Sequence, residues 1–256
     1  MTSMLSLLRV GDGSRLFANA FYLWLSFIAP SASGFFFWVV AARLYSAEAV
    51  GVGAAAFSAI VILSEVAHLG MGFGLVRWLP ALNNKDAARL INSAFTLGGI
   101  VSLGVFLIFL FGVELLAPPL RILRQQPAYF LFFLALAPWA VLYPLLGHTF
   151  LAFRDARYTL LQNLVATMVR IGLVVALASY LPSFGVIAAA GAGVVVGVGL
   201  GFAYSLRRLL PGYRPRLALP DGSLRQLLPY SFGNYLSNLL LWAPTYVMPI
   251  LAVNRL

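Results

Sequence analysis

The feature that most constrains the fold of this chain is a series of apolar runs, each long enough to cross a lipid bilayer. About twenty consecutive apolar residues span the hydrocarbon core of a membrane. Of the 256 residues, 62% are hydrophobic and only 9% are charged, whereas a soluble domain carries roughly a quarter charged residues. A soluble fold could not bury so much apolar surface. We therefore expect an all-α, polytopic transmembrane helix bundle of about seven spans.

The apolar runs and the breaks between them predict the domain organisation. We expect a six-helix transmembrane lobe over residues 1–206, a basic cytoplasmic linker over 207–227 and the first helix of a second lobe over 228–256. The expected spans lie near 17–42, 47–75, 91–116, 128–152, 158–181, 184–206 and 228–253.

Lysine and arginine concentrate in alternate loops, which predicts the orientation of the chain. One side has Arg9, Arg15, Arg77, Lys85, Arg89, Arg154, Arg157, Arg207, Arg208, Arg214, Arg216 and Arg225, and the other has Arg43, Arg121, Arg124 and Arg255. By the positive-inside rule the N-terminus is cytoplasmic, in a multi-pass protein of the cell inner (plasma) membrane. The net charge of +10 is then mainly a topology signal and does not indicate nucleic-acid binding. The first apolar run continues through GFFFWVVAA, which favours an uncleaved span over a signal peptide.

The sequence offers little to catalysis or to metal binding. It contains no cysteine, and its two histidines, His68 and His148, lie far apart with no set of ligands around either. No glycine-rich phosphate loop and no Ser/His/Asp arrangement occurs, so we expect no catalytic residue, no metal site, no cofactor and no enzyme activity. His148 is interpreted as a hydrogen-bonded histidine near the membrane interface.

The fifth span carries a polar stripe that ends in a cation. Asn163, Thr167 and Arg170 are spaced at i, i+4 and i+7, which places them on one helix face. An arginine at mid-membrane costs roughly 2.5 to 3.5 kcal/mol on insertion scales, so it normally faces a bundle interior or a wet cavity. We interpret the stripe as the wall of a cavity. The alternative is a structural ion pair with Glu65, the acid that lies deep in another span.

Glu65, His68 and Arg77 interrupt the second span. Glu65 and His68 lie three residues apart and share a helix face. A histidine beside a carboxylate can titrate near physiological pH, so the two are candidates for ion coupling. The simpler interpretation is a hydrogen-bonded pair that joins this span to its neighbours. Arg77 lies near the cytoplasmic end, where an arginine acts as an anchor or as part of a cytoplasmic gate.

Small residues recur at every fourth position of the sixth span. They are Gly185, Ala189, Gly193, Gly197 and Gly201. Such a ridge lets another helix approach to backbone contact. We expect this contact inside one bundle rather than at a dimer seam.

The first and seventh spans resemble each other. Both open with Phe, a small residue and Asn (Phe17–Asn19 and Phe232–Asn234), and both carry Ala-Pro about ten residues later. The polar stripes on them are Asn19, Tyr22, Ser26 and Ser33 in the first span and Ser231, Asn234, Asn238 and Thr245 in the seventh. Transporters are often built from two repeated lobes with the substrate between them. If the seventh span restarts the first, we expect the chain to stop one helix into a second lobe, as an incomplete protein.

The stretch WVVAARLYSAEAVGVGAAAFSAIVILSEVAHLGMGFGLVRWLP, residues 38–80, resembles the polysaccharide-biosynthesis exporters of bacteria. These are the O-antigen flippase-like branch of the multidrug/oligosaccharidyl-lipid/polysaccharide exporter superfamily, and the match is to their N-terminal half. The matching features are AARLYS at the exit of the first helix, the glycine-rich start AVGVGAAAFSA and the ending LVRWLP.

This resemblance implies a lobe of an alternating-access flippase that moves a lipid-linked oligosaccharide through a cationic cavity, which is a role in lipopolysaccharide synthesis. By position, Arg170 would attract the phosphate of the substrate, and Glu65 with His68 could couple to protons. The residues expected to line the cavity are Arg170, Asn163, Thr167, Asn19, Ser26, Asn234 and Asn238. The expected partners are membrane lipid, the lipid-linked glycan and either a missing second half or further copies of the chain. The alternatives are a multidrug/cation antiporter and a non-transporting scaffold subunit.

Overall fold

The computed structural model describes residues 10–218, together with Ser231, Gly233, Tyr235, Leu236, Leu240, Leu241 and Met248. All regular structure in these residues is helical, and no strand occurs among them. The described part of the chain is therefore all-α, as the apolar runs predict. The expected seventh span lies largely outside the described residues.

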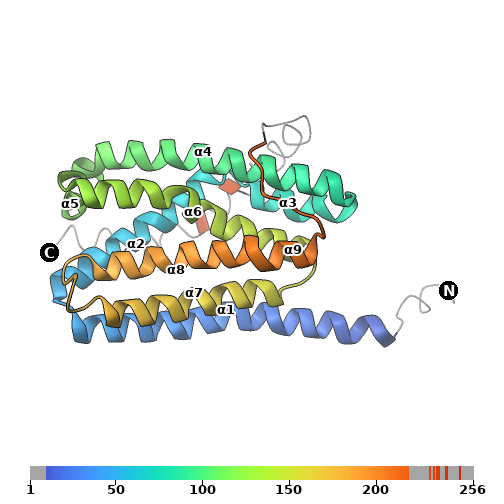
Figure 1. Cartoon of the computed structure of the whole chain (residues 1–256), viewed down its shortest axis with the longest axis horizontal. Coiled ribbons are helices and arrows are strands. Elements are labelled where there is room, and N and C mark those ends of the chain that lie inside the picture. The colour runs from blue at the N-terminus through green and yellow to red at the C-terminus, as the bar shows by residue number, and fades with distance from the viewer. Residues whose placement is uncertain are drawn as a thin grey trace.

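The long helices run nearly side by side along the long axis of the molecule (Figure 1). α7 packs between α1 and α8, while α6 contacts α3, α4 and α8, and α2 reaches α4, α6 and α8. In chain order the helices are α1 (Val10–Leu44), α2 (Ala47–Ala67), α3 (Met71–Trp78), α4 (Asn84–Leu116), α5 (Ile122–Gln125), α6 (Pro127–Ala152), α7 (Arg157–Ala176), α8 (Gly185–Leu200) and α9 (Leu206–Leu209). The 3-10 turns η1 (Leu79–Ala81) and η2 (Pro118–Leu120) and the π-helical turn η3 (Gly201–Ser205) complete the connections.

Several helices have the length and composition of membrane spans. Five qualify among the described residues, namely Ala47–Ala67, Asn84–Leu116, Pro127–Ala152, Arg157–Ala176 and Gly185–Leu209, and α1 adds a shorter apolar stretch over Ser33–Leu44. The total of about seven spans remains a prediction.

The second expected span, 47–75, is not one helix. α2 ends at Ala67 and α3 starts at Met71. Between them Leu69 and Gly70 adopt positive φ angles of 50° and 71°, in the left-handed region that breaks the helical hydrogen-bond ladder. The apolar pattern runs through this break without a signal, because hydropathy does not report backbone angles.

α4 begins at Asn84, earlier than the expected start near 91. Asn83 caps it, because its side-chain oxygen accepts hydrogen bonds from the backbone N–H groups of Lys85 (3.1 Å) and Asp86 (3.0 Å). The 33 residues of α4 extend about 50 Å, against a hydrocarbon core of about 30 Å. The first turns of α4 therefore extend beyond the hydrocarbon.

Three groups of buried apolar side chains hold the bundle together. The first, around Met71 and Leu145, joins α3, α4 and α6. The second joins α2, α4, α6 and α8 around Phe106 and Phe133, whose ring centroids lie 5.1 Å apart. The third, around Phe37, joins α1 to α7 and α8. Together these clusters hold α1, α2, α6, α7 and α8 in place around a cavity, which the side chains of these helices leave open.

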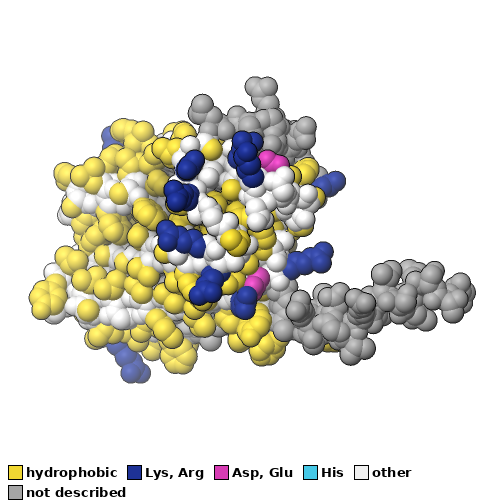
Figure 2. Space-filling view, turned by 45° about the vertical axis from the view of Figure 1, so that its right-hand side comes forward, with side chains coloured by type: hydrophobic (Ala, Val, Ile, Leu, Met, Phe, Trp, Pro, Cys, Tyr) yellow, Lys and Arg dark blue, Asp and Glu magenta, His cyan; other side chains and the backbone are white. Residues whose placement is uncertain are grey.

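Basic side chains gather at one end of the bundle, where α3, α9 and the start of α4 lie (Figures 1 and 2). The exposed cations of this end are Arg77, Lys85, Arg89, Arg154, Arg157, Arg207, Arg208, Arg214 and Arg216. The opposite end carries Arg43 in the last turn of α1, Arg121 before α5 and Arg124 in α5. The alternation along the sequence thus becomes a separation in space, and the cytoplasmic placement of the basic end remains a prediction.

Candidate substrate cavity

A cavity of about 630 Å³ lies between α1, α2, α6, α7 and α8. This volume is in the range of sites that bury a small-molecule ligand. Its wall is mainly apolar, with polar groups on α1, α2, α6 and α7. The lining residues are Leu23, Ser31, Ser33, Gly34, Phe37, Trp38, Phe57, Ile60, Val61, Ser64, Glu65, Ala140, Tyr143, Pro144, Gly147, His148, Leu151, Thr159, Asn163, Thr167, Arg170, Ala190 and Val194.

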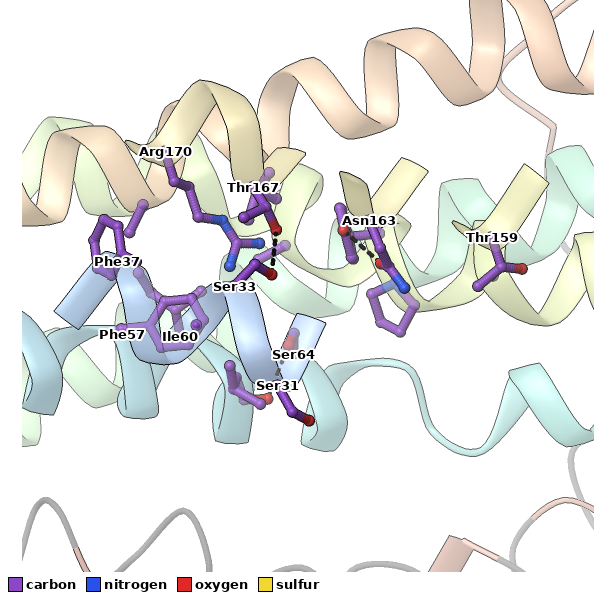
Figure 3. Close-up of a pocket in the computed structure, with 18 of the residues that line it drawn as sticks. Ser31, Ser33, Phe37, Phe57, Ile60, Ser64, Thr159, Asn163, Thr167 and Arg170 are labelled. Carbon is purple, nitrogen blue, oxygen red and sulfur yellow. Dashed lines mark hydrogen bonds between the residues drawn. The ribbon is translucent and has the colours of Figure 1, made fainter. Parts of the chain in front are cut away.

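The polar residues of α7 line this cavity from one helix face (Figure 3). The structure brings together Asn163, Thr167 and Arg170, the three residues of the stripe that the sequence indicates. Thr159 extends the stripe by one more turn. Its position four residues before Asn163 is the signal that would have found it. The binding role of these residues remains a prediction.

Arg170 extends from α7 toward α1 and α2 (Figure 3). Its guanidinium carbon lies 5.4 Å from the centroid of the Phe57 ring, a favourable cation–π distance. Its Nε atom is buried without a hydrogen-bond partner, and the arginine forms no ion pair with any residue that the structure describes. In particular, the carboxylate of Glu65 pairs with His68.

A glycine of α8 makes room for the Arg170 side chain. A Cβ atom at Gly193 would lie 2.5 Å from Cγ and 2.8 Å from Nε of Arg170, and 2.6 Å from the carbonyl oxygen of Ala166. The other glycines of the ridge face Tyr45, Tyr143 and Leu146, which is packing inside the bundle as the spacing predicts.

Hydrogen bonds tie the remaining polar groups of the stripe to neighbouring helices. The Tyr143 hydroxyl donates to Asn163 Oδ1 at 2.8 Å, and the Ser33 hydroxyl donates to the Thr167 hydroxyl oxygen at 3.4 Å. Asn163 and Thr167 thus have neutral partners from α6 and α1. Arg170 supplies the positive charge of this wall.

Glu65 and His68 form a hydrogen-bonded pair at the end of α2. His68 Nδ1 accepts a hydrogen bond from the backbone N–H of Gly70 at 2.9 Å. Nε2 therefore carries the proton and donates to Glu65 Oε2 at 2.9 Å. The side chain of His68 is 1% exposed and that of Glu65 is 25% exposed. Glu65 is thus the member of the pair that the cavity reaches.

The break after α2 is contacted by residues from the far end of the chain. The Tyr235 hydroxyl donates to the carbonyl oxygen of Val66 at 3.1 Å, a backbone group near the helix end. A Cβ atom at Gly70 would lie 2.7 Å from the carbonyl oxygen of Ser231 and from Cβ of Tyr235. Glycine is required at position 70 both for its φ angle and for this close approach.

His148 of α6 also lines the cavity beside this pair. Its ring centroid lies 6.2 Å from that of His68 and 5.7 Å from that of Phe73. Its Nδ1 atom donates to the carbonyl oxygen of Pro144 at 2.9 Å. No sequence spacing could have joined His148 to Glu65 and His68, because α6 and α2 meet only through tertiary packing.

The other predicted site residues fall away from the cavity or outside the description. Arg77 is exposed at the end of α3, with its guanidinium carbon 5.2 Å from the centroid of the Trp78 ring, and does not line the cavity. Asn19 and Ser26 lie on α1, but their side chains are outside the described residues, as are Asn234 and Asn238. Within the described ranges, no group of three or more His, Asp or Glu side chains could hold a metal ion.

Membrane-length apolar helices around a ligand-sized cavity define the class: a multi-pass membrane protein with the general form of a transporter. The family model for polysaccharide biosynthesis proteins matches residues 16–254. The chain therefore belongs to this family, whose members are generally transporters rather than enzymes. Comparison with curated proteins and with solved structures finds no match.

Proposed function

We propose that this chain supplies a lobe of an exporter that moves a lipid-linked oligosaccharide or polysaccharide precursor across the membrane by alternating access. The family places the protein in polysaccharide biosynthesis, and the carrier lipid of such a precursor is joined to the sugar through phosphate. The function therefore requires a passage that receives an anion. The second lobe belongs to the proposal, as do the inner membrane and the cytoplasmic basic end.

The observation that carries the proposal is the position of Arg170. A buried charge without a partner is costly unless water or a counter-ion reaches it. Arg170 lines the cavity and has no carboxylate partner among the described residues. A phosphate group that enters the cavity would supply the missing anion, and a guanidinium can bind it through two parallel hydrogen bonds.

The charge of the cavity weighs against the alternatives. The one carboxylate among the lining residues, Glu65, is hydrogen-bonded to His68, whereas Arg170 has no carboxylate partner among the described residues, so the cavity favours an anion over a cationic drug. A scaffold subunit needs no arginine in a cavity between its helices. An anionic substrate fits the arrangement of Arg170 and the neutral stripe of α7 best.

The proposal is tested by transport with purified protein. The complete reading frame is expressed, and the product is reconstituted into vesicles that hold a lipid-linked oligosaccharide. We expect the sugar to become accessible to a membrane-impermeant glycosidase at a rate that depends on the protein. Unchanged accessibility at all protein densities, with uptake of a cationic dye in the same vesicles, would support the antiporter instead.

Glu65 is proposed to couple transport to protons, since it is the member of the Glu65–His68 pair that the cavity reaches. Glu65→Gln keeps the shape of the side chain but removes its titration, so we expect the pH dependence of transport to flatten. Ser64→Ala, on the same helix and at the same cavity, is the control and should keep the parental profile. A Glu65→Gln variant with the parental profile would leave the pair with a structural role only.

A further inference from the structure

The segment Leu210–Ala218 follows α9 and lies along the first turns of α4; we call it the strap. Its backbone is held by the side chains of Asn92 and Thr96. Asn92 is 8% exposed and serves three groups of the strap at once. The hydrogen bonds run from the Tyr213 hydroxyl to Asn92 Oδ1 (2.7 Å), from the Arg216 N–H to Asn92 Oδ1 (3.4 Å), from Asn92 Nδ2 to the Arg214 carbonyl (3.3 Å) and from the Ala218 N–H to Thr96 Oγ1 (3.1 Å).

One side of the strap belongs to the core of the bundle. Leu210 and Tyr213 are buried in the cluster that joins α3, α4 and α6. Burial raises the pKa of the Tyr213 phenol, which keeps it protonated as a hydrogen-bond donor to Asn92. The other side of the strap exposes Arg214 and Arg216, and Leu217 is 92% exposed. The strap thus presents two cations and an apolar side chain from a fixed backbone.

The exposed residues of α4 locate the level of the membrane surface. Between Arg89 and Glu114 α4 exposes no charged side chain, and its exposed large apolar side chains begin at Ile100 and continue to Leu116. Glu114 lies in the last turn of α4 and pairs with Arg124, so it marks the opposite end of the apolar stretch. The stretch from Ile100 to Leu116 rises about 25 Å, close to the thickness of the hydrocarbon core. Thr96, which binds the strap at Ala218, lies only about 6 Å along the axis before Ile100. This level predicts that Leu217 lies at the boundary between headgroups and acyl chains.

Aromatic and basic residues at the same end of the bundle support this placement of the membrane surface. Tyr204 is 44% exposed, and the Arg208 guanidinium carbon lies 5.6 Å from the centroid of its ring. Tyrosine and tryptophan are enriched where a protein meets the membrane interface. Among the side chains that the structure describes at this end, Asp86 pairs with Arg89 and Asp155 with Arg157. Arg207, Arg208, Arg214 and Arg216 are all exposed, and Figure 2 shows Lys and Arg side chains gathered on this end of the molecule.

We propose that the strap is a binding site for anionic phospholipids of the bilayer, separate from the transport cavity. Arg214 and Arg216 bind the headgroup phosphates, and Leu217 inserts among the first carbons of the acyl chains. Polybasic segments beside a membrane span are attracted to anionic headgroups in this way. The fixed backbone distinguishes the strap from a mobile basic tail, because its arginines and its leucine keep one depth.

The depth of Leu217 can be measured directly, because the sequence contains no cysteine. A fluorophore is attached to Leu217→Cys, or to Lys85→Cys in the exposed first turn of α4 as the control, in vesicles with anionic phospholipid. We expect a nitroxide at a shallow position on the lipid chain to quench the label at 217 severalfold more than the label at 85. Aqueous iodide should quench them in the opposite order. Equal quenching of both labels by iodide would overturn the insertion of Leu217.

The contribution of Arg214 and Arg216 to lipid binding is measured separately. Anionic phospholipid retained by the purified protein is counted by native mass spectrometry for Arg214→Gln/Arg216→Gln and for Arg43→Gln/Arg121→Gln, whose arginines lie at the other end. We expect each arginine of the strap to contribute about fivefold to the enrichment, so the first double variant loses far more lipid than the second. Equal retention in the two double variants would overturn the proposal. Transport of the glycan is a separate readout, so the strap can fail while the proposed function stands.

Discussion

Arg170→Ala is expected to lower export of the lipid-linked glycan by about 10- to 100-fold, because a hydrogen bond to a charged group contributes about 1.5 to 3 kcal/mol. The thermal stability of the protein should stay equal or rise. Arg170 has no carboxylate partner among the described residues, so its removal takes a costly buried charge out of the fold. A structural ion pair would give the opposite result, a loss of stability.

The experiment measures transport in vesicles and thermal unfolding in detergent for the same purified variants. Met168→Ala is the matched control, since Met168 lies on the same helix and is 69% exposed. Arg170→Lys should retain part of the activity, because an ammonium keeps the charge but cannot form the paired hydrogen bonds of a guanidinium. Equal export by Arg170→Ala and Met168→Ala would remove Arg170 from the mechanism.

Gly193→Val is expected to cost about 1 to 3 kcal/mol of stability and to reduce export as Arg170→Ala does. The new side chain would meet Arg170 and also the carbonyl oxygen of Ala166, at 2.6 Å from the Cβ position. A flexible arginine can move away, but a helix carbonyl cannot, so α8 must shift from α7 and the guanidinium loses its place in the cavity.

Gly199→Ala is the control on the same helix, because a Cβ atom at Gly199 would meet no other group within 4 Å. This control should be neutral or should stabilise the protein by up to about 1 kcal/mol, since alanine favours the helix over glycine. Both variants are compared by thermal unfolding and by transport. If Gly193→Val unfolds and transports like Gly199→Ala, the close contact between α7 and α8 is not needed for either property.

The sequence was most informative where the relevant pattern is local. The apolar runs predicted a helical membrane protein, and the spacing of Asn163, Thr167 and Arg170 identified one wall of the cavity, because both follow from the period of a helix. The small residues of α8 predicted close packing for the same reason. Residues 38–80 carried the family resemblance, which the family model extends to residues 16–254.

The sequence was least informative where the structure depends on backbone angles or on contacts between residues far apart in the chain. The apolar pattern of residues 47–75 concealed the break at Leu69 and Gly70, since an apolar residue is equally compatible with a helix or with a buried turn. Nothing near His148 in the chain indicated that its ring would lie beside His68. The partners of the strap, Asn92 and Thr96, lie at the start of the expected span 91–116, but nothing in its apolar pattern indicated that they would bind the backbone of Arg214, Arg216 and Ala218.

The glycines of α8 limit how this cavity can change shape. Tyr45, Tyr143 and Arg170 each occupy a notch on α8 that would close if the helix were displaced by one residue. Tyr45 also donates to the carbonyl oxygen of Val174 at 2.8 Å, so the turn between α1 and α2 is pinned to α7. The close fit of Arg170 and the Ala166 carbonyl against Gly193 opposes sliding of α7 along α8. We therefore expect the cavity to widen by movement of α1 and α2 about that turn, which would open it toward the far, arginine-rich end of the bundle.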